Sequence, residues 1–454
     1  MNASEQNKQN QQERVIPKLR FPEFQTALGW KQDILGNLFD ERGKKNHPEK
    51  TILAATQDKG VIPYELMEKS VIRDRKNLNG YKLVLPEDFV ISLRSFEGGF
   101  EYSAYEGIIS PAYVILYPKI KICNYFFRIY FKRDSFIQQI QNNLNNSLRD
   151  GKSISYKQAA GLKIALPLFE EQQKIADCLS SLDELIELQE QKLAALKQHK
   201  KGLMQQLFPS HNDLQASKQA SKQASKQASK QASKQASKQA SKQASKIVYP
   251  KLRFPQFKNC EGWEVVLLSD IALVNPKKEK LPDRLQISFI PMSQVSEDGK
   301  INNVEIKKVY EVKKGYTAFK DNDIIFAKIT PCFENGKAAL LNNLENGYGF
   351  GSTEFHVIRP KNSDGLSTFL FAYLYSNELF TQGKLSMTGS AGQQRVPAIF
   401  FENYLVALPS AKEQQAIADC LSSLDNLISE QSEQIGRLKT HKKGLMQQLF
   451  PTIQ

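Results

Sequence analysis

The residues that come closest to a catalytic pattern are Pro282-Asp283 and Glu305-Ile306-Lys307. In metal-dependent nucleases, two acidic side chains of this kind hold Mg²⁺ and the lysine orients a water molecule. The pattern is short and permissive, and it lies in a lysine-rich stretch with no second copy in the first half of the chain. A charged surface cluster is therefore the favoured interpretation, and neither a catalytic residue nor a metal ligand is assigned.

Other catalytic signatures are missing from the sequence. It has no glycine-rich phosphate loop and no Gly-x-Gly-x-x-Gly. An Asn-Pro-Pro-aromatic motif for adenine methylation is also missing, because Asn275-Pro276 is followed by Lys277. The five histidines are scattered, and no Cys/His cluster has the spacing of a zinc site. We therefore expect a chain without catalytic activity of its own.

Five polar side chains are candidates for contact with DNA: Arg94, Lys328 and the polar turn of Gln393, Gln394 and Arg395. Phosphate contacts position a protein on DNA, and a few side chains in the grooves specify the sequence. The alternative is that these residues are solvated surface charges. The net charge of +14 includes eight lysines of one low-complexity segment, which leaves about +6 for the rest. This moderate basic bias suits a nucleic-acid partner without establishing one.

These residues belong to a chain that repeats itself. Residues 15–24 return as 248–257, and the two tryptophans, Trp30 and Trp263, keep the same offset of 233. Residues 171–209 return as 413–451, with 28 of 39 positions identical, whereas the stretches between the copies barely resemble each other. The pattern predicts two units that share their joints and present different recognition surfaces at a fixed separation.

Short β-rich runs with turn signals alternate with helical patterns, which predicts an α+β fold containing two globular α/β domains. The second domain repeats a faint skeleton of the first, and an amphipathic helix is expected at 125–144. The expected boundaries are a disordered tail at 1–14, a first recognition domain at 15–167, a helix at 168–209, a low-complexity spacer at 210–246, a second recognition domain at 247–410 and a second helix at 411–454.

Each predicted long helix has a hydrophobic seam whose residues recur in steps of four and three, the heptad spacing of paired helices. Thirty-nine helical residues would span roughly 58 Å. Each seam could pack on its own domain, but pairing is expected, with Gln189 and Gln431 fixing the register. Parallel pairing would set the domains side by side, whereas the expected antiparallel coiled coil sets them at opposite ends in a pseudo-twofold arrangement. The residues assigned to pairing are Ile175, Leu179, Leu182, Ile186, Gln189, Leu193, Ile417, Leu421, Leu424, Ile428, Gln431 and Ile435.

The spacer contains eight tandem copies of Gln-Ala-Ser-Lys at 215–246. A period of four does not match 3.6 residues per turn, so no constant apolar face forms and the array cannot bury a core. It is either a solvated helical strut or a flexible linker.

Targeting signals are not expected. Residues 1–12 are polar and lack the apolar run of a signal peptide, and no stretch approaches 18 apolar residues. The five cysteines show no pairing pattern, which is typical of a reducing compartment. A cytoplasmic protein without a membrane partner is expected.

The doubled joint carries a family resemblance. Leu166-Pro167 and Leu408-Pro409 each lead into a near-identical helix that begins Glu-Gln-Gln-x-Ile-Ala, at Glu171 and Glu413. Together with the segments at 107–113 and 323–332, these motifs resemble the specificity (S) subunit of type I restriction–modification systems. The resemblance covers nearly all of 15–451.

This resemblance implies a non-catalytic reader of double-stranded DNA. Each variable domain would recognise one half of a bipartite, asymmetric target. The paired helices would act as a ruler and as a dock for two adenine methyltransferase (M) subunits, and restriction/motor (R) subunits would join that complex. S-adenosylmethionine, ATP and Mg²⁺ would be used by those partners, so no cofactor is expected in this chain.

Overall fold

A computed structural model describes residues 14–67, 75–91, 99–142, 155–220, 247–361, 365–390 and 392–452. Arg94 and the Gln-Ala-Ser-Lys copies beyond residue 220 lie outside the described residues. The chain divides into two compact units, which we call unit 1 (residues 1–191 and 432–454) and unit 2 (residues 192–431). Among the described residues, no helix is both long and apolar enough to cross a membrane.

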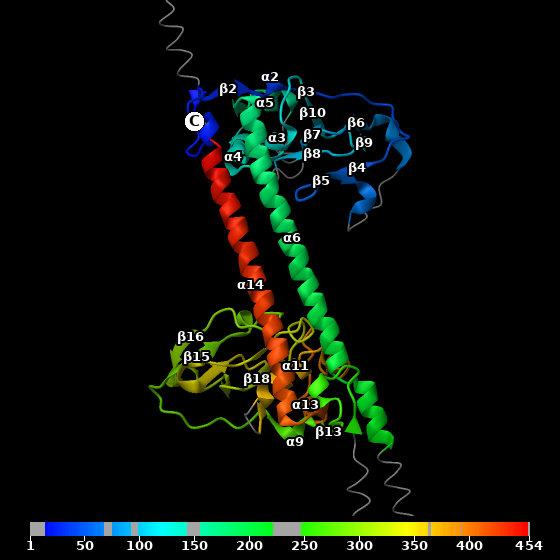
Figure 1. Ribbon diagram of the computed structural model, residues 1–454, viewed down its shortest axis with the longest axis vertical. Helices are drawn as coiled ribbons and strands as arrows, with labels where there is room; N and C mark the ends of the chain where they lie inside the picture. The colour runs from blue at the N-terminus through cyan, green and yellow to red at the C-terminus, as the bar shows by residue number, and fades with distance from the viewer. Residues whose placement is uncertain are drawn as a thin grey trace, which may run out of the picture. The chain divides into compact units, whose positions relative to one another are not determined.

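Unit 1 is built on two antiparallel sheets, with helices packed against them (Figure 1). The three-stranded sheet has the order β1 (Arg14–Val15), β2 (Trp30–Ile34), β11 (Lys163–Leu166). The four-stranded sheet has the order β3 (Phe39–Glu41), β10 (Val114–Pro118), β7 (Phe89–Ile91), β8 (Phe100–Tyr102). Two antiparallel strand pairs are added: the hairpin of β4 (Leu53–Thr56) with β5 (Gly60–Pro63), and β6 (Lys82–Val84) with β9 (Gly107–Ile109). The short helices are α2 (Leu35–Leu38), α3 (Asn124–Tyr130), α4 (Asp134–Asn142) and α5 (Tyr156–Ala160).

Unit 2 repeats the same two sheets. The three-stranded sheet is β12 (Ile247–Val248), β13 (Trp263–Leu267), β22 (Leu405–Leu408), and the four-stranded sheet is β14 (Ala272–Val274), β21 (Phe355–Pro360), β18 (Ile324–Ala327), β19 (Ala338–Leu340). A different four-stranded sheet is added: β16 (Glu305–Lys308), β15 (Gln286–Ile290), β20 (Tyr348–Gly351), β17 (Thr317–Lys320). The short helices are α9 (Leu268–Ile271), α10 (Val309–Val312), α11 (Leu366–Leu374), α12 (Asn377–Leu385) and α13 (Ala398–Glu402).

The central strands of the repeated sheet explain the apolar runs in the sequence. In β18, Ile324 and Phe326 face the helices, whereas Ile325 faces a second core cluster. In β7, Phe89 and Ile91 likewise belong to one core cluster and Val90 to another. Successive side chains of a strand point to opposite faces, so a strand that is covered on both faces is apolar throughout. The shared framework is thus the repeated pair of sheets, and the divergence lies in the strands that cover its second face.

Two long helices, α6 (Phe169–Leu207) and α14 (Ala411–Leu449), each contribute to both units. The core of unit 1 contains Ile175 and Leu179 from the start of α6 together with Leu449 and Phe450 from the end of the second half of the chain. The core of unit 2 contains the equivalent pairing, with Leu207 from the end of α6. Each globular part therefore packs on the start of its own helix and on the end of the other one.

A buried ion pair joins the globular part of unit 1 to α6. The carboxylate of Glu171 accepts hydrogen bonds from Arg20 Nε and Nη2, both at 2.7 Å, and from Trp30 Nε1 at 3.0 Å. In unit 2, Arg253 binds Glu413 through the same two contacts at 2.7 Å. The segment at 15–24 and the start of the helix thus contact each other, and the contact recurs at 248–257 and Glu413. This contact gives a physical reason why both segments occur twice in the sequence.

The next residue of the motif completes the joint. Gln172 Nε2 donates to the Pro167 carbonyl at 3.0 Å, and its Oε1 accepts from the Cys123 amide at 3.0 Å. Gln414 Nε2 makes the equivalent bond to the Pro409 carbonyl at 2.8 Å. Buried amide groups that are hydrogen-bonded on both sides hold a helix start in one orientation, so the motif orients the globular part on its helix.

The single helix expected at 125–144 is wrong, because the chain forms α3 and α4 with a break at 131–133. Phe131 and Phe136 are both buried, and their ring centroids lie 5.0 Å apart. Residues five positions apart point about 140° away from each other on a continuous α-helix. The break brings both rings into one core, so tertiary packing overrides the local helical pattern.

Candidate nucleic-acid interface

Four of the five candidate contact residues lie together at the carboxyl end of the central strand β18. Lys328 directly follows β18, and its carbonyl accepts from the Val396 amide at 2.8 Å. The Thr330 amide donates to the Gln394 carbonyl at 3.0 Å. These bonds fasten the polar turn at 392–396 alongside 328–330, although the two segments are more than 60 positions apart in the sequence. We call Lys328, Gln393, Gln394 and Arg395 the β18 cluster.

The guanidinium of Arg395 is held in a fixed orientation. Its Nε and Nη2 donate to the two carboxylate oxygens of Glu354 at 3.0 and 2.9 Å, and its Nη1 donates to the Gln393 carbonyl at 3.1 Å. The Arg395 side chain is 42% exposed. The hydrogen bond from Arg395 lowers the pKa of Glu354, so this carboxylate stays charged at neutral pH. Arg395 is therefore a preoriented but partly compensated cation, because an anionic partner would have to compete with Glu354.

A buried histidine, His356, is hydrogen-bonded to the turn that carries the cluster. The sequence alone does not indicate this contact. His356 Nε2 lies 2.7 Å from the Val396 carbonyl, and because a carbonyl only accepts, Nε2 carries the proton. His356 Nδ1 then accepts from the Asn275 amide at 2.9 Å. Burial lowers the pKa of His356, so the ring remains neutral. The neutral imidazole ring holds the turn through its hydrogen bond to the Val396 carbonyl and adds no positive charge to the candidate interface.

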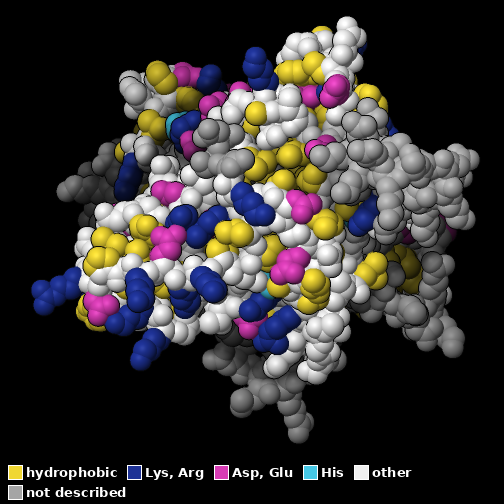
Figure 2. All heavy atoms as spheres, turned by 90° about the horizontal axis from the view of Figure 1, so that it is seen from below, with side chains coloured by type: hydrophobic (Ala, Val, Ile, Leu, Met, Phe, Trp, Pro, Cys, Tyr) yellow, Lys and Arg dark blue, Asp and Glu magenta, His cyan; other side chains and the backbone are white. Residues whose placement is uncertain are grey.

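Basic side chains are also frequent in the segment that carries three of the strands that distinguish unit 2, mostly in the connections between them. The segment 277–320, which contains β15, β16 and β17, has ten Lys or Arg against six Asp or Glu. Figure 2 shows Lys and Arg side chains gathered on the side of the face where β15 and β16 lie in Figure 1. Asp and Glu are interspersed among them. This is the charge pattern of a surface that attracts a polyanion weakly and without a fixed position.

The residues with the spacing of a nuclease site form surface ion pairs. Lys313 Nζ binds both carboxylate oxygens of Asp283 at 2.8 and 2.9 Å, and Lys307 Nζ lies 3.2 Å from Glu305. Within the described ranges, no group of three or more His, Cys, Asp or Glu side chains could hold a metal ion. The lysines neutralise the two carboxylates that would have been metal ligands.

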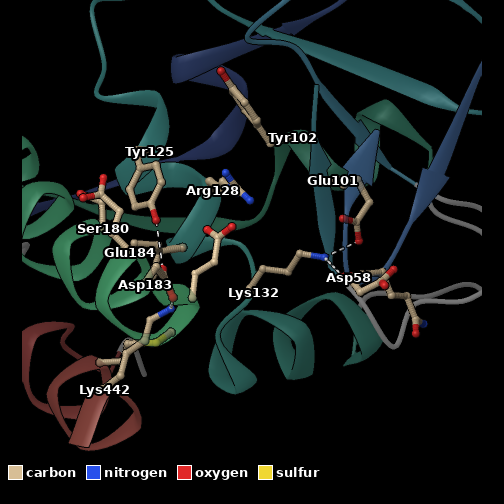
Figure 3. A pocket seen from close by; sticks show the side chains of 15 residues that line it. Asp58, Glu101, Tyr102, Tyr125, Arg128, Lys132, Ser180, Asp183, Glu184 and Lys442 are labelled. Carbon is tan, nitrogen blue, oxygen red and sulfur yellow. Dashed lines mark hydrogen bonds and ion pairs between the residues drawn. The ribbon is translucent and has the colours of Figure 1, made fainter. Parts of the chain in front are cut away.

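Unit 1 contains a different kind of site, a cavity of about 500 Å³ between β8, α3 and the two long helices (Figure 3). Tyr125 Oη donates to Asp183 at 3.0 Å, and Lys442 forms an ion pair with the same carboxylate. On the opposite wall, Lys132 reaches across to Glu101 (Figure 3). The lining has five carboxylates against three cationic side chains, so a DNA phosphate is not expected to enter. These carboxylates are Asp58, Glu101, Asp183, Glu184 and Glu187.

Glu101 is the most perturbed acid of this cavity. It is 3% exposed, and burial raises its pKa to about 7 despite the ion pair with Lys132. Its Oε2 has no hydrogen-bond partner among the described residues. The folded state therefore favours the protonated acid, which can donate from that oxygen.

We expect the stability of unit 1 to fall as the pH rises from about 4.5 to about 7. A folded-state pKa above the ordinary value of 4.5 means that the folded protein binds more protons in this window. Protonated Glu101 contributes its full stabilisation below the unfolded-state pKa, and this stabilisation is lost as the pH rises through the folded-state pKa. The expected loss in the free energy of unfolding is about 1–3 kcal/mol. Urea denaturation at several pH values measures it.

Glu101→Gln should flatten this pH dependence, because the amide cannot ionise. Glu106→Gln is the matched control, since Glu106 is an exposed acid whose hydrogen bond from Lys50 lowers its pKa. The control should keep the slope of the unaltered protein between pH 4.5 and 7. Equal slopes in both variants would show that Glu101 is not the group responsible.

The residues assigned to helix pairing have three environments. Ile175, Leu179, Ile417 and Leu421 are buried in the cores of the globular parts. Ile186, Gln431 and Ile435 are also buried, at 8%, 4% and 6% exposure. The remainder are half-buried: Leu182, Gln189, Leu193, Leu424 and Ile428.

Ion pairs connect the two long helices within each unit. Lys442 of α14 pairs with Asp183 of α6 in unit 1, and Lys200 of α6 binds Asp425 of α14 at 2.6 and 2.7 Å in unit 2. These are the same two positions of the repeated helix, exchanged between the copies. Two backbone hydrogen bonds show the same exchange between the copies. The Leu19 amide donates to the Gln448 carbonyl at 3.0 Å, and the Leu252 amide donates to the Gln206 carbonyl at 2.9 Å.

A sequence model of the type I restriction modification DNA specificity domain matches the chain twice, at residues 28–198 and 260–437. The matches include both helix starts, with Glu171 and Glu413, and the greater part of both long helices, and together they cover well over half of the chain.

Individual relatives fall into two groups. The type I restriction enzyme EcoEI specificity subunit of Escherichia coli is 44% identical over 200 residues, which is 43% of this chain and 33% of the relative. The EcoAI specificity subunit of the same organism is 42% identical over 200 residues. These matches span about a third of each E. coli relative. The MjaVIII specificity subunit of Methanocaldococcus jannaschii is 24% identical over 436 residues, covering 90% of this chain and 89% of the relative.

The fold is similar to that of a solved structure described under the words "complex assembly and conformational transition of the type I R-M system". That structure has a TM-score of 0.52 at 13% sequence identity, and covers 94% of this chain and 98% of its own.

Proposed function

The chain belongs to the type I restriction–modification DNA specificity family, and from this premise we propose that it reads a bipartite, asymmetric DNA target without catalysing a reaction. Unit 1 would recognise one half of the target and unit 2 the other. The family resemblance found at the two joints is confirmed by the twofold match of the family's sequence model.

The observation that carries this proposal is the combination of an identical joint with different surfaces. Arg20–Glu171 and Arg253–Glu413 fix both globular parts to their helices by the same bonds. The strands added to the common framework differ, with two separate pairs in unit 1 and a four-stranded sheet in unit 2. An asymmetric two-part DNA target requires two different recognition domains that are attached in the same way, because the spacing of the half-sites mirrors the geometry of the protein.

We further propose that α6 and α14 form an antiparallel coiled coil with a pseudo-twofold relation. The exchanged ion pairs support this, because Lys442–Asp183 and Lys200–Asp425 use equivalent residues in opposite order. The buried Gln431 supports it as well, since a polar residue in an apolar seam fixes the register of paired helices. The paired helices would set the separation of the two readers.

The repeated surfaces also define the partners that we propose. Because the joint and the helix occur twice, two methyltransferase subunits would dock on them, and restriction/motor subunits would join the resulting complex. S-adenosylmethionine, ATP and Mg²⁺ would bind to those partners. A mass measurement should give two methyltransferase subunits per chain, and a stable one-to-one complex with no larger species would contradict this stoichiometry.

Sequencing of methylated bases in cells that express this chain with its methyltransferase partner tests the proposed function. We expect methylated adenines in one motif composed of two defined half-sites with a constant number of unspecified bases between them. Cells that express the methyltransferase alone serve as the control and should lack the motif. A contiguous motif, or DNA binding without sequence preference, would exclude a two-part reader.

Arg395→Ala should weaken DNA binding by about 1–3 kcal/mol if the side chain reads a base, with relaxed specificity at one position. A phosphate contact would instead weaken binding to all sequences alike and reduce its salt dependence. Arg437→Ala removes the same charge from the exposed surface of α14, where the arginine is 74% exposed, and should have a smaller effect. Fluorescence anisotropy with labelled duplexes at several salt concentrations measures both.

The variant Arg395→Ala also leaves the Glu354 carboxylate unpaired, and this charge would itself repel DNA. The double variant Arg395→Ala/Glu354→Ala separates the two effects. Binding that stays weak in the double variant indicates a lost contact of Arg395. Full recovery would show that Arg395 only neutralises Glu354, and the assignment of Arg395 to the DNA interface would be wrong.

A further inference from the structure

Unit 2 contains a cavity of about 570 Å³ that the reading of DNA does not explain. It lies between the last turns of α6, the segment that follows α6, and the ends of α11 and β22. Its volume falls within the range of small-molecule sites, about 300–1,000 Å³. The lysines Lys197, Lys201 and Lys251 line it together with several aromatic residues. Glu378 also lines it, and its Oε1 accepts a hydrogen bond from the His211 backbone amide at 2.9 Å.

One wall of the cavity is cationic. Lys197 and Lys201 lie one helical turn apart on α6, so their side chains emerge on the same face, and Lys251 approaches from the segment before β13. Within the described part of the chain, none of these three lysines is bound to a carboxylate. A fourth lysine, Lys200, is neutralised by Asp425. The wall thus offers three ammonium groups to an anion, and the lysine ammonium is a common ligand of phosphate.

Aromatic rings also line the cavity. The ring of Tyr404 lies against that of His211, with a centroid distance of 5.4 Å and an angle of 33°. Phe208 packs edge-on against Tyr373 at 5.0 Å, and Tyr375 is held by a hydrogen bond from its hydroxyl to the Glu297 carbonyl at 2.6 Å. Tyr373 and Tyr404 are buried, whereas Phe208 and Tyr375 are half-buried and line the cavity, so a planar heterocycle can stack on these two rings.

His211 adds an unused hydrogen-bond donor. Its Nε2 lies 2.8 Å from the amide nitrogen of Gln215, which can only donate, so Nε2 accepts and the proton resides on Nδ1. Burial lowers the pKa of His211, in agreement with a neutral ring. Nδ1 is buried and has no hydrogen-bond partner among the described residues. A buried donor without a partner is rare in folded proteins, and an acceptor atom of a ligand would satisfy it.

We propose that this cavity binds a nucleoside phosphate, either free or at the 5′ end of a nucleic-acid strand. Lys197, Lys201 and Lys251 hold the phosphate, and the base lies against Phe208 and Tyr375. The Nδ1–H of His211 donates to a nitrogen or carbonyl acceptor of the base.

The site is specific to unit 2. Tyr373 and Tyr130 are equivalent, because their hydroxyls accept from the equivalent amides of Ala407 and Ala165 at 3.1 and 2.9 Å. Two residues further on, unit 2 has Tyr375 whereas unit 1 has Lys132, which reaches into the acidic cavity. The proposal therefore predicts one nucleotide per chain.

Isothermal titration of the full-length chain with AMP, inorganic phosphate and adenosine tests the proposal. We expect one AMP per chain, bound at least about tenfold more tightly than phosphate or adenosine, because only AMP engages both the lysines and the aromatic rings. Lys197→Ala/Lys201→Ala should weaken AMP binding by about tenfold or more. Lys439→Ala/Lys443→Ala changes the equivalent positions of α14 and removes the same charge, so it should leave AMP binding unchanged. Circular dichroism confirms that both variants fold.

His211→Phe retains the ring but removes the donor, and should weaken AMP while leaving the affinity for phosphate unchanged. A 5′-phosphorylated single strand, compared with the same strand ending in a hydroxyl, distinguishes the two sources of the ligand. Phosphate-dependent binding of the strand that is lost in Lys197→Ala/Lys201→Ala assigns the site to strand ends, and binding of AMP alone assigns it to free nucleotides. No binding of AMP, GMP, CMP or UMP at millimolar concentration, or equal losses in the two lysine variants, would overturn the proposal.

Discussion

Glu171→Ala is expected to destabilise unit 1 by about 3–5 kcal/mol. The substitution leaves the guanidinium of Arg20 buried without its counter-charge, since the Arg20 side chain is 7% exposed and that of Glu171 is 1% exposed. It also removes the acceptor of the Trp30 indole N–H. Urea denaturation, followed by the fluorescence of Trp30 and Trp263 in single-tryptophan backgrounds, measures the loss for each unit.

The repeat offers a matched control for this experiment. Glu413→Ala breaks the equivalent ion pair with Arg253, but Trp263 Nε1 has no hydrogen-bond partner in the described part of the chain. We therefore expect its cost to be smaller by about 1 kcal/mol, the typical net value of one hydrogen bond. Glu23→Ala removes an exposed pair with Lys174 and should have little effect on stability. A loss for Glu171→Ala no larger than that for Glu23→Ala would show that the joint does not hold unit 1 together.

The second large effect concerns the DNA target. Replacing residues 15–167 by residues 248–409 of the same chain should remove the first half-site and put a copy of the second half-site in its place. The exchange preserves the joint, because Arg253 and Trp263 take the places of Arg20 and Trp30 at Glu171. Under the proposed pseudo-twofold arrangement, the two identical half-sites would be inverted with respect to each other.

Sequencing of methylated bases, with the methyltransferase partner present, reads the outcome directly. The expected motif contains the original second half-site twice, and the original first half-site disappears from the methylated positions. A control exchange that carries Arg253→Ala within the incoming copy should yield no motif, because the joint of unit 1 is broken. Persistence of the original first half-site after the exchange would disprove the assignment of one reader to each unit.

The two effects are linked by the physical design of the joint. Because Arg20 and Trp30 belong to the globular part and Glu171 to the helix, we expect a foreign domain to be accepted when it brings the same arginine and tryptophan. The remaining surface of the domain is free to differ, as the added strands of the two units do. Stability and specificity therefore depend on separate sets of residues.

The duplication, the long helices and the family were accessible from the sequence alone. The repeated Glu-Gln-Gln-x-Ile-Ala motifs and the apolar steps of four and three are local signals, and the expected helices at 168–209 and 411–454 correspond to α6 (Phe169–Leu207) and α14 (Ala411–Leu449). A helix of this length has a period that remains visible whatever it packs against. The reason for the repeated motifs was not visible, since nothing in the sequence indicates that Glu171 binds Arg20 across about 150 positions.

Only the tertiary structure decided which segments meet. The expected helix is interrupted at 131–133, and Phe131 and Phe136 share a core. The turn at 392–396 lies at the end of β18, where it is hydrogen-bonded to the neutral ring of His356. The tertiary structure also placed Leu449 and Phe450, at the far end of the chain, in the core of unit 1. Contacts of this kind join residues that are far apart in the sequence, so they leave no periodic pattern; they form because each buried polar group needs a partner and each apolar face needs a cover.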